Sequence, residues 1–241
     1  MNNYQPHRLR KLLINIQRCG YRFVSLDEFI KSGGEAGDVA ITFDDGFEMI
    51  YMQVYPILAE LGIPAAIFIP AGFIGKPASW DYSAVFRTLR HLNREQLAEM
   101  SRNNIIIGSH GMTHTDLTGI SDRLIRLELK QSKEELERII GTKVRYISYP
   151  FGRFDERIES LALETGYERG FSMSFFKKSR YGFSLPRHAV YAIDTTYSVL
   201  NKFGGGFLGG IEKVKGAVMN SYSSGTILLN RFRFSDLTRE H

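Results

Sequence analysis

The feature that most constrains the fold is an alternation of short apolar runs with longer amphipathic segments. Residues 38–43 (DVAITF) and 63–70 (IPAAIFIP) are apolar runs typical of buried strands, and residues 49–62 between them have helical character. A strand, a helix and a second strand at this spacing form a βαβ unit, whose two strands run parallel. The sequence therefore predicts an α/β protein built on a parallel sheet, either a β/α barrel or an open doubly wound sheet.

The same alternation continues along the chain. Helices are expected over 8–16, over 91–103 with Asn93 as cap, over 122–141 with Ser121 as cap, and over 156–166. A short strand at 21–24 precedes a helical turn capped by Ser25, with Glu28 completing a capping-box pattern. Further strands are predicted at 105–110, 146–150, 166–173, 185–191 and 225–230.

Composition narrows the class of protein. The 241 residues contain no linker or repeat, so we expect one catalytic domain over 1–241. The single cysteine, Cys19, excludes an internal disulfide framework and is expected to be a packed thiol. The net charge of +5 is scattered, and its densest basic stretch, 175–183, is predicted to be a solvated loop. We therefore expect no nucleic-acid partner.

The sequence contains no apolar segment of the length that crosses a membrane. Its first residues are basic and lack the apolar stretch and cleavage site of a signal peptide. We therefore expect a cytoplasmic location, with an exported protein that has lost its leader as the alternative. The oligomeric state is not predicted.

Polar residues follow three of the predicted strands. Asp44-Asp45-Gly46 follows the first strand, the segment His110–His114 follows another, and Pro150-Phe151-Gly152 ends a third. In parallel α/β folds the carboxyl ends of the strands meet at one edge, where active sites form. These residues are therefore expected to lie close together.

Two adjacent carboxylates at the rim of an apolar core repel each other, unless a cation neutralises one of them. The H-x-x-x-H spacing of His110 and His114 brings two imidazoles to one side of a turn, where they can share a metal. Two histidines and one aspartate form a three-ligand set with an open position for water, and the other aspartate can accept a proton. The alternatives are ordinary surface or core histidines and a helix start capped by Asp45.

The order TFDDG, H-x-x-x-H and PFG resembles the polysaccharide deacetylases of the NodB-homology type, carbohydrate esterase family 4. The flanking segments GYRFVSLDEF and YPILAELGIPAAIFI and the pair Ser79-Trp80 are similar too. The resemblance extends from about Leu9 to Val190, and it implies a deacetylase core over about 9–231. It also implies a distorted, TIM-like (β/α) barrel of about seven strands.

The resemblance implies a role for each motif. Asp44 corresponds to the general base, and Asp45, His110 and His114 correspond to the ligands of a divalent metal, usually Zn²⁺. The backbone N–H of Phe151 corresponds to the group that helps to hold the oxyanion. The implied reaction removes N-acetyl groups from N-acetylglucosamine-type sugars. Substrate contacts are expected from Pro150, Phe151 and Trp80, although a lone tryptophan is more often a core residue.

The sequence departs from the family pattern in three places. Ser148 stands where an arginine often holds the base, and Arg187 is a candidate replacement. The terminal strand lacks the usual histidine acid, which leaves His188 or Asp44 itself to return the proton. Gly111 replaces the usual Ser or Thr, and Thr113 is a candidate for the lost hydroxyl.

Two other functions remain open. The fold also supports deformylases and cyclic-amide hydrolases acting on small or lipid-linked substrates. The missing terminal histidine leaves room for a non-catalytic, metal-containing sugar-binding module. An intact base beside the metal ligands argues against the binding module.

Overall fold

The computed structural model describes residues 5–78, 89–173, 179–191 and 194–203. In this part of the chain, six parallel strands form one curved sheet, and each strand pairs with the next in sequence. The strands are β3 (Ile41–Phe43), β4 (Ala65–Ile69), β5 (Ile105–Ser109), β6 (Tyr146–Ser148), β7 (Arg169–Ser172) and β8 (Ser184–Pro186). The sheet curls into an incomplete barrel, so the prediction of a distorted (β/α) barrel is confirmed.

The predicted strand at 38–43 is divided at Ala40. Its first half, β2 (Asp38–Val39), pairs with β1 (Arg22–Phe23) in a separate two-stranded sheet. Its second half is β3, which pairs with β4. One extended segment therefore joins the small sheet to the barrel and ends at Asp44.

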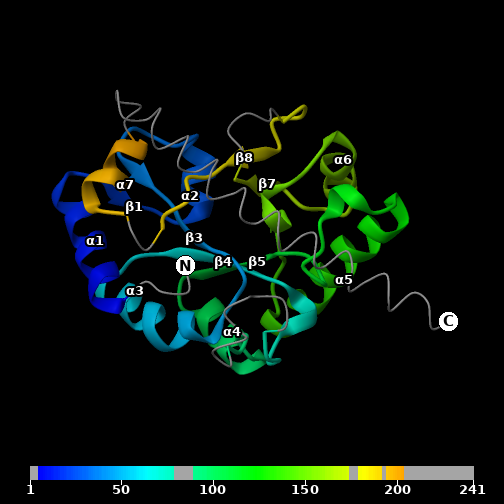
Figure 1. Cartoon of the computed structure of the whole chain (residues 1–241), viewed down its shortest axis with the longest axis horizontal. Helices are drawn as coiled ribbons and strands as arrows, with labels where there is room; N and C mark the ends of the chain where they lie inside the picture. The colour runs from blue at the N-terminus through cyan, green and yellow to red at the C-terminus, as the bar shows by residue number, and fades with distance from the viewer. Residues whose placement is uncertain (1–4, 79–88, 174–178, 192–193, 204–241) are drawn as a thin grey trace.

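Helices lie around the outside of the curved sheet (Figure 1), except α2 (Leu26–Ser32), whose Leu26 packs against the side chains inside the barrel. The helices are α1 (Pro6–Arg18), α2, α3 (Tyr55–Leu61), α4 (Arg94–Arg102), α5 (Asp122–Ile140), α6 (Glu156–Glu164) and α7 (Thr196–Phe203). At one end of the sheet, α1 and α7 lie side by side, and Asn15 donates a hydrogen bond to Thr196 at 3.2 Å. The sequence analysis predicted no helix at α7.

The predicted helix over 49–62 begins with a π-helical stretch, Ile50–Val54, and continues as α3. The N–H of Tyr55 bonds to the carbonyl of Ile50, five residues earlier. Pro56 has no N–H with which to continue the α-helical pattern at this point. The local deviation from an α-helix therefore coincides with the proline.

The predicted helix caps have different outcomes. Asn93 forms both hydrogen bonds of a capping box with Gln96, so this cap is confirmed. The Ser25 hydroxyl accepts a bond from the N–H of Glu28, but the Glu28 carboxylate pairs with Arg22. Ser121 occupies the N-cap position of α5 without a capping bond from its side chain. The expectation that Cys19 is packed is wrong, because Cys19 is exposed.

The two faces of the sheet are both buried. Ala65, Ile67 and Ile69 pack outward in the large cluster beneath the helices, whereas Ala66 and Phe68 belong to a second cluster inside the barrel. A Cβ at Gly108 would lie 2.5 Å from the Phe68 ring, so the glycine makes room for this interior side chain. Because side chains fill the barrel, the polar groups gather at its carboxyl end.

Parts of the prediction fall outside the described residues. These include the strand at 225–230, Trp80 and residues 175–178 of the basic stretch 175–183. The extent of the single domain over 1–241 therefore stays a prediction. Among the residues described, no helix has the length and apolarity that a membrane crossing requires.

Candidate metal centre and active site

The histidines of the H-x-x-x-H motif converge on the second aspartate of Asp44-Asp45. The Oδ1 atom of Asp45 lies 3.3 Å from Nε2 of His114 and 3.6 Å from Nε2 of His110. One ligand atom from each of the three residues lies within 4.8 Å of those of the other two. The structure thus brings together the residues that the sequence proposed as a metal-binding set.

His110 follows β5 directly and is buried. Its Nδ1 lies 2.7 Å from the carbonyl oxygen of Ser148 on β6. Since a carbonyl can only accept a hydrogen bond, Nδ1 carries the proton and Nε2 keeps its lone pair. Burial lowers the pKa of His110, with the charge of His114 adding to this effect. A neutral imidazole with Nε2 facing the site is the form that binds a metal.

Asp45 is held in its ionised form. Burial raises the pKa of this carboxyl group, but the hydrogen bond from His114 and the charges of both histidines outweigh burial, so the pKa lies below its usual range. One carboxylate and two imidazoles are a common protein donor set for a catalytic zinc ion. The three side chains therefore fit a divalent metal of this type.

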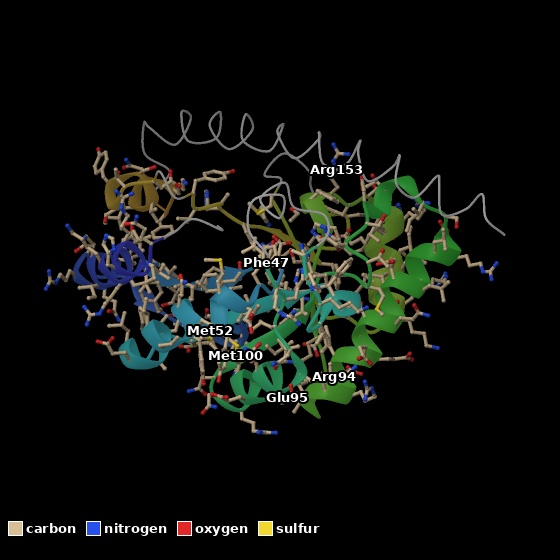
Figure 2. The ribbon with its side chains drawn as sticks, turned by 60° about the horizontal axis from the view of Figure 1, so that its bottom comes forward. Phe47, Met52, Arg94, Glu95, Met100 and Arg153 are labelled. Atoms are coloured by element: carbon tan, nitrogen blue, oxygen red, sulfur yellow. The ribbon has the colours of Figure 1, made fainter. Side chains whose placement is uncertain are left out.

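His91 supports Asp45 from the segment that precedes α4. Its Nδ1 donates a hydrogen bond of 2.8 Å to the backbone carbonyl of Asp45. Its ring stacks on Phe47, near the centre of the view in Figure 2, with ring centroids 4.9 Å apart. The sequence analysis gave His91 no role, because no spacing relates it to the DDG motif.

The backbone at the site adopts unusual conformations. Four non-glycine residues have a positive φ in the described part of the chain, and three of them are Asp45, His114 and Phe151, with φ of 70°, 56° and 59°. Such conformations are disfavoured for residues with a Cβ, and they concentrate at functional sites. The fold therefore imposes local strain on two of the metal-binding candidates and on the PFG motif.

Asp44 is bound by Arg187, which follows β8. Two guanidinium nitrogens of Arg187 lie 2.9 Å and 2.7 Å from the two carboxylate oxygens of Asp44. Ser148 donates a hydrogen bond of 3.2 Å to the same carboxylate and accepts one of 2.7 Å from Arg187. The arginine that the family pattern places at 148 is thus replaced in space by Arg187, with Ser148 as a bridge.

These contacts determine the charge of Asp44. Burial raises the pKa of its carboxyl group, but the positive charge of Arg187, with smaller contributions from His110 and the Arg187 hydrogen bonds, lowers it below its usual value. Asp44 is therefore a carboxylate at neutral pH. A fixed carboxylate beside the histidines can accept a proton.

Arg187 also connects the two ends of the curved sheet. Its guanidinium donates a hydrogen bond of 2.9 Å to Thr42 on β3, although the residue itself follows β8. The same group lies 5.2 Å and 5.8 Å from the ring centroids of Phe68 and Phe171. Only 12% of the Arg187 side chain is exposed, so these partners restrict its position.

The other predicted site residues differ in their placement. The Phe151 ring packs against His114, with ring centroids 4.9 Å apart. Pro150 is buried, which leaves little of its surface for a substrate. His188 is exposed and adjacent to Arg187. The Thr113 hydroxyl donates to Glu128 on α5 at 2.6 Å, a partner that the sequence analysis missed.

The chain resembles known proteins over the part that carries the DDG and H-x-x-x-H motifs. The family model described as polysaccharide deacetylase matches residues 31–170, which include the DDG and H-x-x-x-H motifs. The chain belongs to the polysaccharide deacetylase family. Solved deacetylases share its fold: the Streptococcus pyogenes deacetylase PplD, solved in complex with acetate, aligns over 83% of this chain and 87% of its own, with a TM-score of 0.70 and 23% identity.

Curated proteins with similar sequences match part of the chain. The YxkH protein of Bacillus subtilis (strain 168) is 35% identical over 132 residues, which are 55% of this chain and 43% of the relative. The poly-beta-1,6-N-acetyl-D-glucosamine N-deacetylase of Staphylococcus aureus (strain MRSA252) is 28% identical over 165 residues, or 63% and 54% of the two chains. The aligned part of this chain thus spans about half the length of these two relatives.

Proposed function

We propose that this protein is a metal-dependent amide hydrolase that removes N-acetyl groups from N-acetylglucosamine-type sugars. The observation that carries the proposal is the Asp44 carboxylate, fixed by Arg187 within the turn that also presents Asp45 to His110 and His114. A binding protein would have no need of a clamped base at that position. Membership of the polysaccharide deacetylase family supports the same reaction.

The substrate class is supported by the relatives. The Staphylococcus aureus relative is named for N-deacetylation of poly-beta-1,6-N-acetyl-D-glucosamine. The equivalent substrate for this chain is an N-acetylated sugar or oligosaccharide. The part-exposed Phe151 ring beside His114 offers an apolar surface next to the candidate site.

Asp45, His110 and His114 would hold the metal, and Zn²⁺ is the ion that this donor set suits best. When bound, a divalent ion would supply Lewis-acid polarisation of the acyl oxygen and would lower the pKa of water at the site. Asp44 accepts the proton of the attacking water, because Arg187 keeps its carboxylate ionised and oriented.

The remaining steps need a stabilised oxyanion and a proton for the departing amine. Phe151, whose backbone is in the left-handed region, carries the N–H that the family pattern assigns to the oxyanion. Either Asp44, once it is protonated, or the exposed His188 returns the proton to the amine. A His188→Gln variant that retains full turnover assigns this step to Asp44.

The first test is acetate release from short N-acetylglucosamine oligomers by the zinc-loaded protein, with Asp44→Asn as the control. The parent is expected to release acetate. The variant is expected to lose at least about 100-fold in kcat, because general-base catalysis contributes roughly that factor or more. Its zinc affinity is expected to remain. Full turnover by Asp44→Asn would refute the role of Asp44.

A panel of formylated and cyclic-amide substrates, assayed in parallel, distinguishes the acyl group. Turnover of a formyl or ring amide without acetate release would replace the N-deacetylase with a related hydrolase. Zinc and oligosaccharide binding without turnover of any member of the panel would support the non-catalytic module instead.

A further inference from the structure

The loop that carries both histidines is fastened to helix α5 by one carboxylate. The Oε2 atom of Glu128 accepts hydrogen bonds from the backbone N–H groups of Met112 and Thr113, at 2.8 Å and 2.9 Å. Its Oε1 atom accepts the Thr113 hydroxyl at 2.6 Å. Three donors from two consecutive residues of the H-x-x-x-H motif thus converge on Glu128.

The opposite side of the loop is fixed by β4. The N–H groups of Ala71 and Gly72, just beyond β4, donate to the carbonyls of Gly111 and Met112 at 3.0 Å and 2.8 Å. The loop therefore receives hydrogen bonds on its carbonyls from one element and gives hydrogen bonds from its N–H groups to another. Such bonds from both sides specify one backbone path through residues 111–113.

Glu128 also explains the glycine that departs from the family pattern. Gly111 has φ of 78°, and a Cβ there would lie 3.2 Å from Oε2 of Glu128. A side chain at 111 would therefore push against the carboxylate as well as strain the backbone. The position that usually carries a hydroxyl instead lets Glu128 approach the loop closely.

The consequence for His114 follows from its backbone. His114 has φ of 56°, a conformation that the loop must impose because it is intrinsically disfavoured. Its neighbour Thr113 provides two of the three bonds to Glu128. We propose that Glu128 is a positioning residue, which sets the affinity of the site for its metal by holding the loop in the conformation that aims His114 at Asp45. This inference rests on the metal site of the proposed function.

The test measures Zn²⁺ affinity of the full-length apoprotein by competition with a chelator, without reference to turnover. Glu128→Ala is expected to weaken Zn²⁺ binding by about 10- to 100-fold, the usual effect of removing a group that orients metal ligands. Glu128→Gln is expected to fall between the parent and the alanine variant. Its carbonyl oxygen can still accept the two N–H bonds, and its amide can donate to the Thr113 hydroxyl.

Thr113→Val removes the hydroxyl but keeps the side-chain shape. It is expected to weaken Zn²⁺ binding less than Glu128→Ala does, and to have no further effect when Glu128 is already alanine. Glu134→Ala is the matched control, since Glu134 is an exposed residue of the same helix that pairs with Lys130 at 3.7 Å. The control is expected to retain the Zn²⁺ affinity of the parent.

The thermal midpoint of each apoprotein separates positioning from simple stabilisation. A Glu128→Ala variant that unfolds earlier but binds Zn²⁺ as tightly as the parent would refute the inference. If Glu128→Ala does not fold, parental affinity in both Glu128→Gln and Thr113→Val would refute it as well. His110→Ala tests the site itself: undiminished Zn²⁺ affinity in that variant would overturn the proposed metal centre, whatever Glu128 does.

Discussion

The two ends of the barrel use charged residues in different ways. At the carboxyl end, Asp44 and Asp45 are adjacent like charges, with Asp45 on strained backbone, and each is held by separate cationic or imidazole partners. At the amino end, Asp27 of α2 accepts a hydrogen bond of 2.6 Å from Tyr146 and pairs with Arg145. That cluster has ordinary pairing between opposite charges.

The difference indicates which end carries function. A chain that required only stability would separate two adjacent aspartates or expose both of them to water, because like charges at a buried rim destabilise the fold. The amino-end cluster needs no such compensation. We therefore expect substitutions at the carboxyl end to alter chemistry more than stability, and those at the amino end to do the opposite.

The largest effect on catalysis is expected from Arg187. Arg187→Met removes the bidentate partner of Asp44 and should lower kcat by about 100-fold or more, because the base loses its orientation and its charge partner. Arg187→Lys keeps the charge but cannot form the planar fork, and it should retain more activity than the methionine variant. Steady-state kinetics measure both.

Arg145→Met at the amino end is the matched control for these variants. Its kcat is expected to equal that of the parent, since Arg145 contacts Asp27 and Glu168 rather than the site. Equal losses of kcat in Arg187→Met and Arg145→Met would contradict the functional distinction between the two ends.

Stabilisation of the fold by Zn²⁺ should depend on the residues of the carboxyl end and not on those of the amino end. Adding Zn²⁺ at about 1,000 times its Kd to the apoprotein should stabilise the fold by about 4 kcal/mol, because the ion binds only the native site. A His110→Ala variant should lose this stabilisation, whereas Asp27→Asn should keep it. Differential scanning calorimetry with and without Zn²⁺ measures the effect, and an equal zinc response in His110→Ala and the parent would exclude this site.

A smaller effect is expected from Asp27→Asn itself. The change removes the ion pair with Arg145 and weakens the hydrogen bond from Tyr146, so it should lower the free energy of unfolding by about 1–2 kcal/mol. Its kcat should match that of the parent. Urea unfolding followed by circular dichroism provides the free energy of unfolding. A fall in kcat with unchanged stability would contradict the assignment of the amino end to stability.

The smallest effect is expected at Glu135, which pairs with Arg94 at the start of α4 (Figure 2) and with Arg138. Burial raises the pKa of Glu135, but its hydrogen bonds with Arg138 and Arg94 outweigh burial and lower it. A lowered native pKa stabilises the fold above the unfolded pKa, and this contribution disappears as the pH falls through the native value.

Glu135→Gln should therefore cost less than about 1 kcal/mol at pH 7, as is usual for exposed ion pairs. The difference from the parent should shrink when unfolding is repeated at acidic pH. A difference that grows on acidification would show that the pair does not act in this way.

Local sequence patterns predicted most of the sheet and its helices, because each strand and helix has its own periodicity. The DDG, H-x-x-x-H and PFG motifs each follow a strand, so parallel strand order alone placed them at one edge. The cap at Asn93 was also predicted, since a cap and the N–H it binds lie within one turn, although its capping-box partner Gln96 was not. The helix α7 was missed, although Thr195 caps it: the N–H of Ser198 donates a hydrogen bond of 3.1 Å to the Thr195 hydroxyl.

The sequence by itself determined which groups contact one another within a motif or across neighbouring strand ends. The sequence offered Arg187 only as a candidate partner of the base, and the tertiary structure decided that it binds Asp44, 143 residues away, and that Glu128 holds the histidine loop. The physical reason is that these pairs depend on how far the sheet curls and on which helix face meets the loop. Neither quantity leaves a period or spacing in the chain.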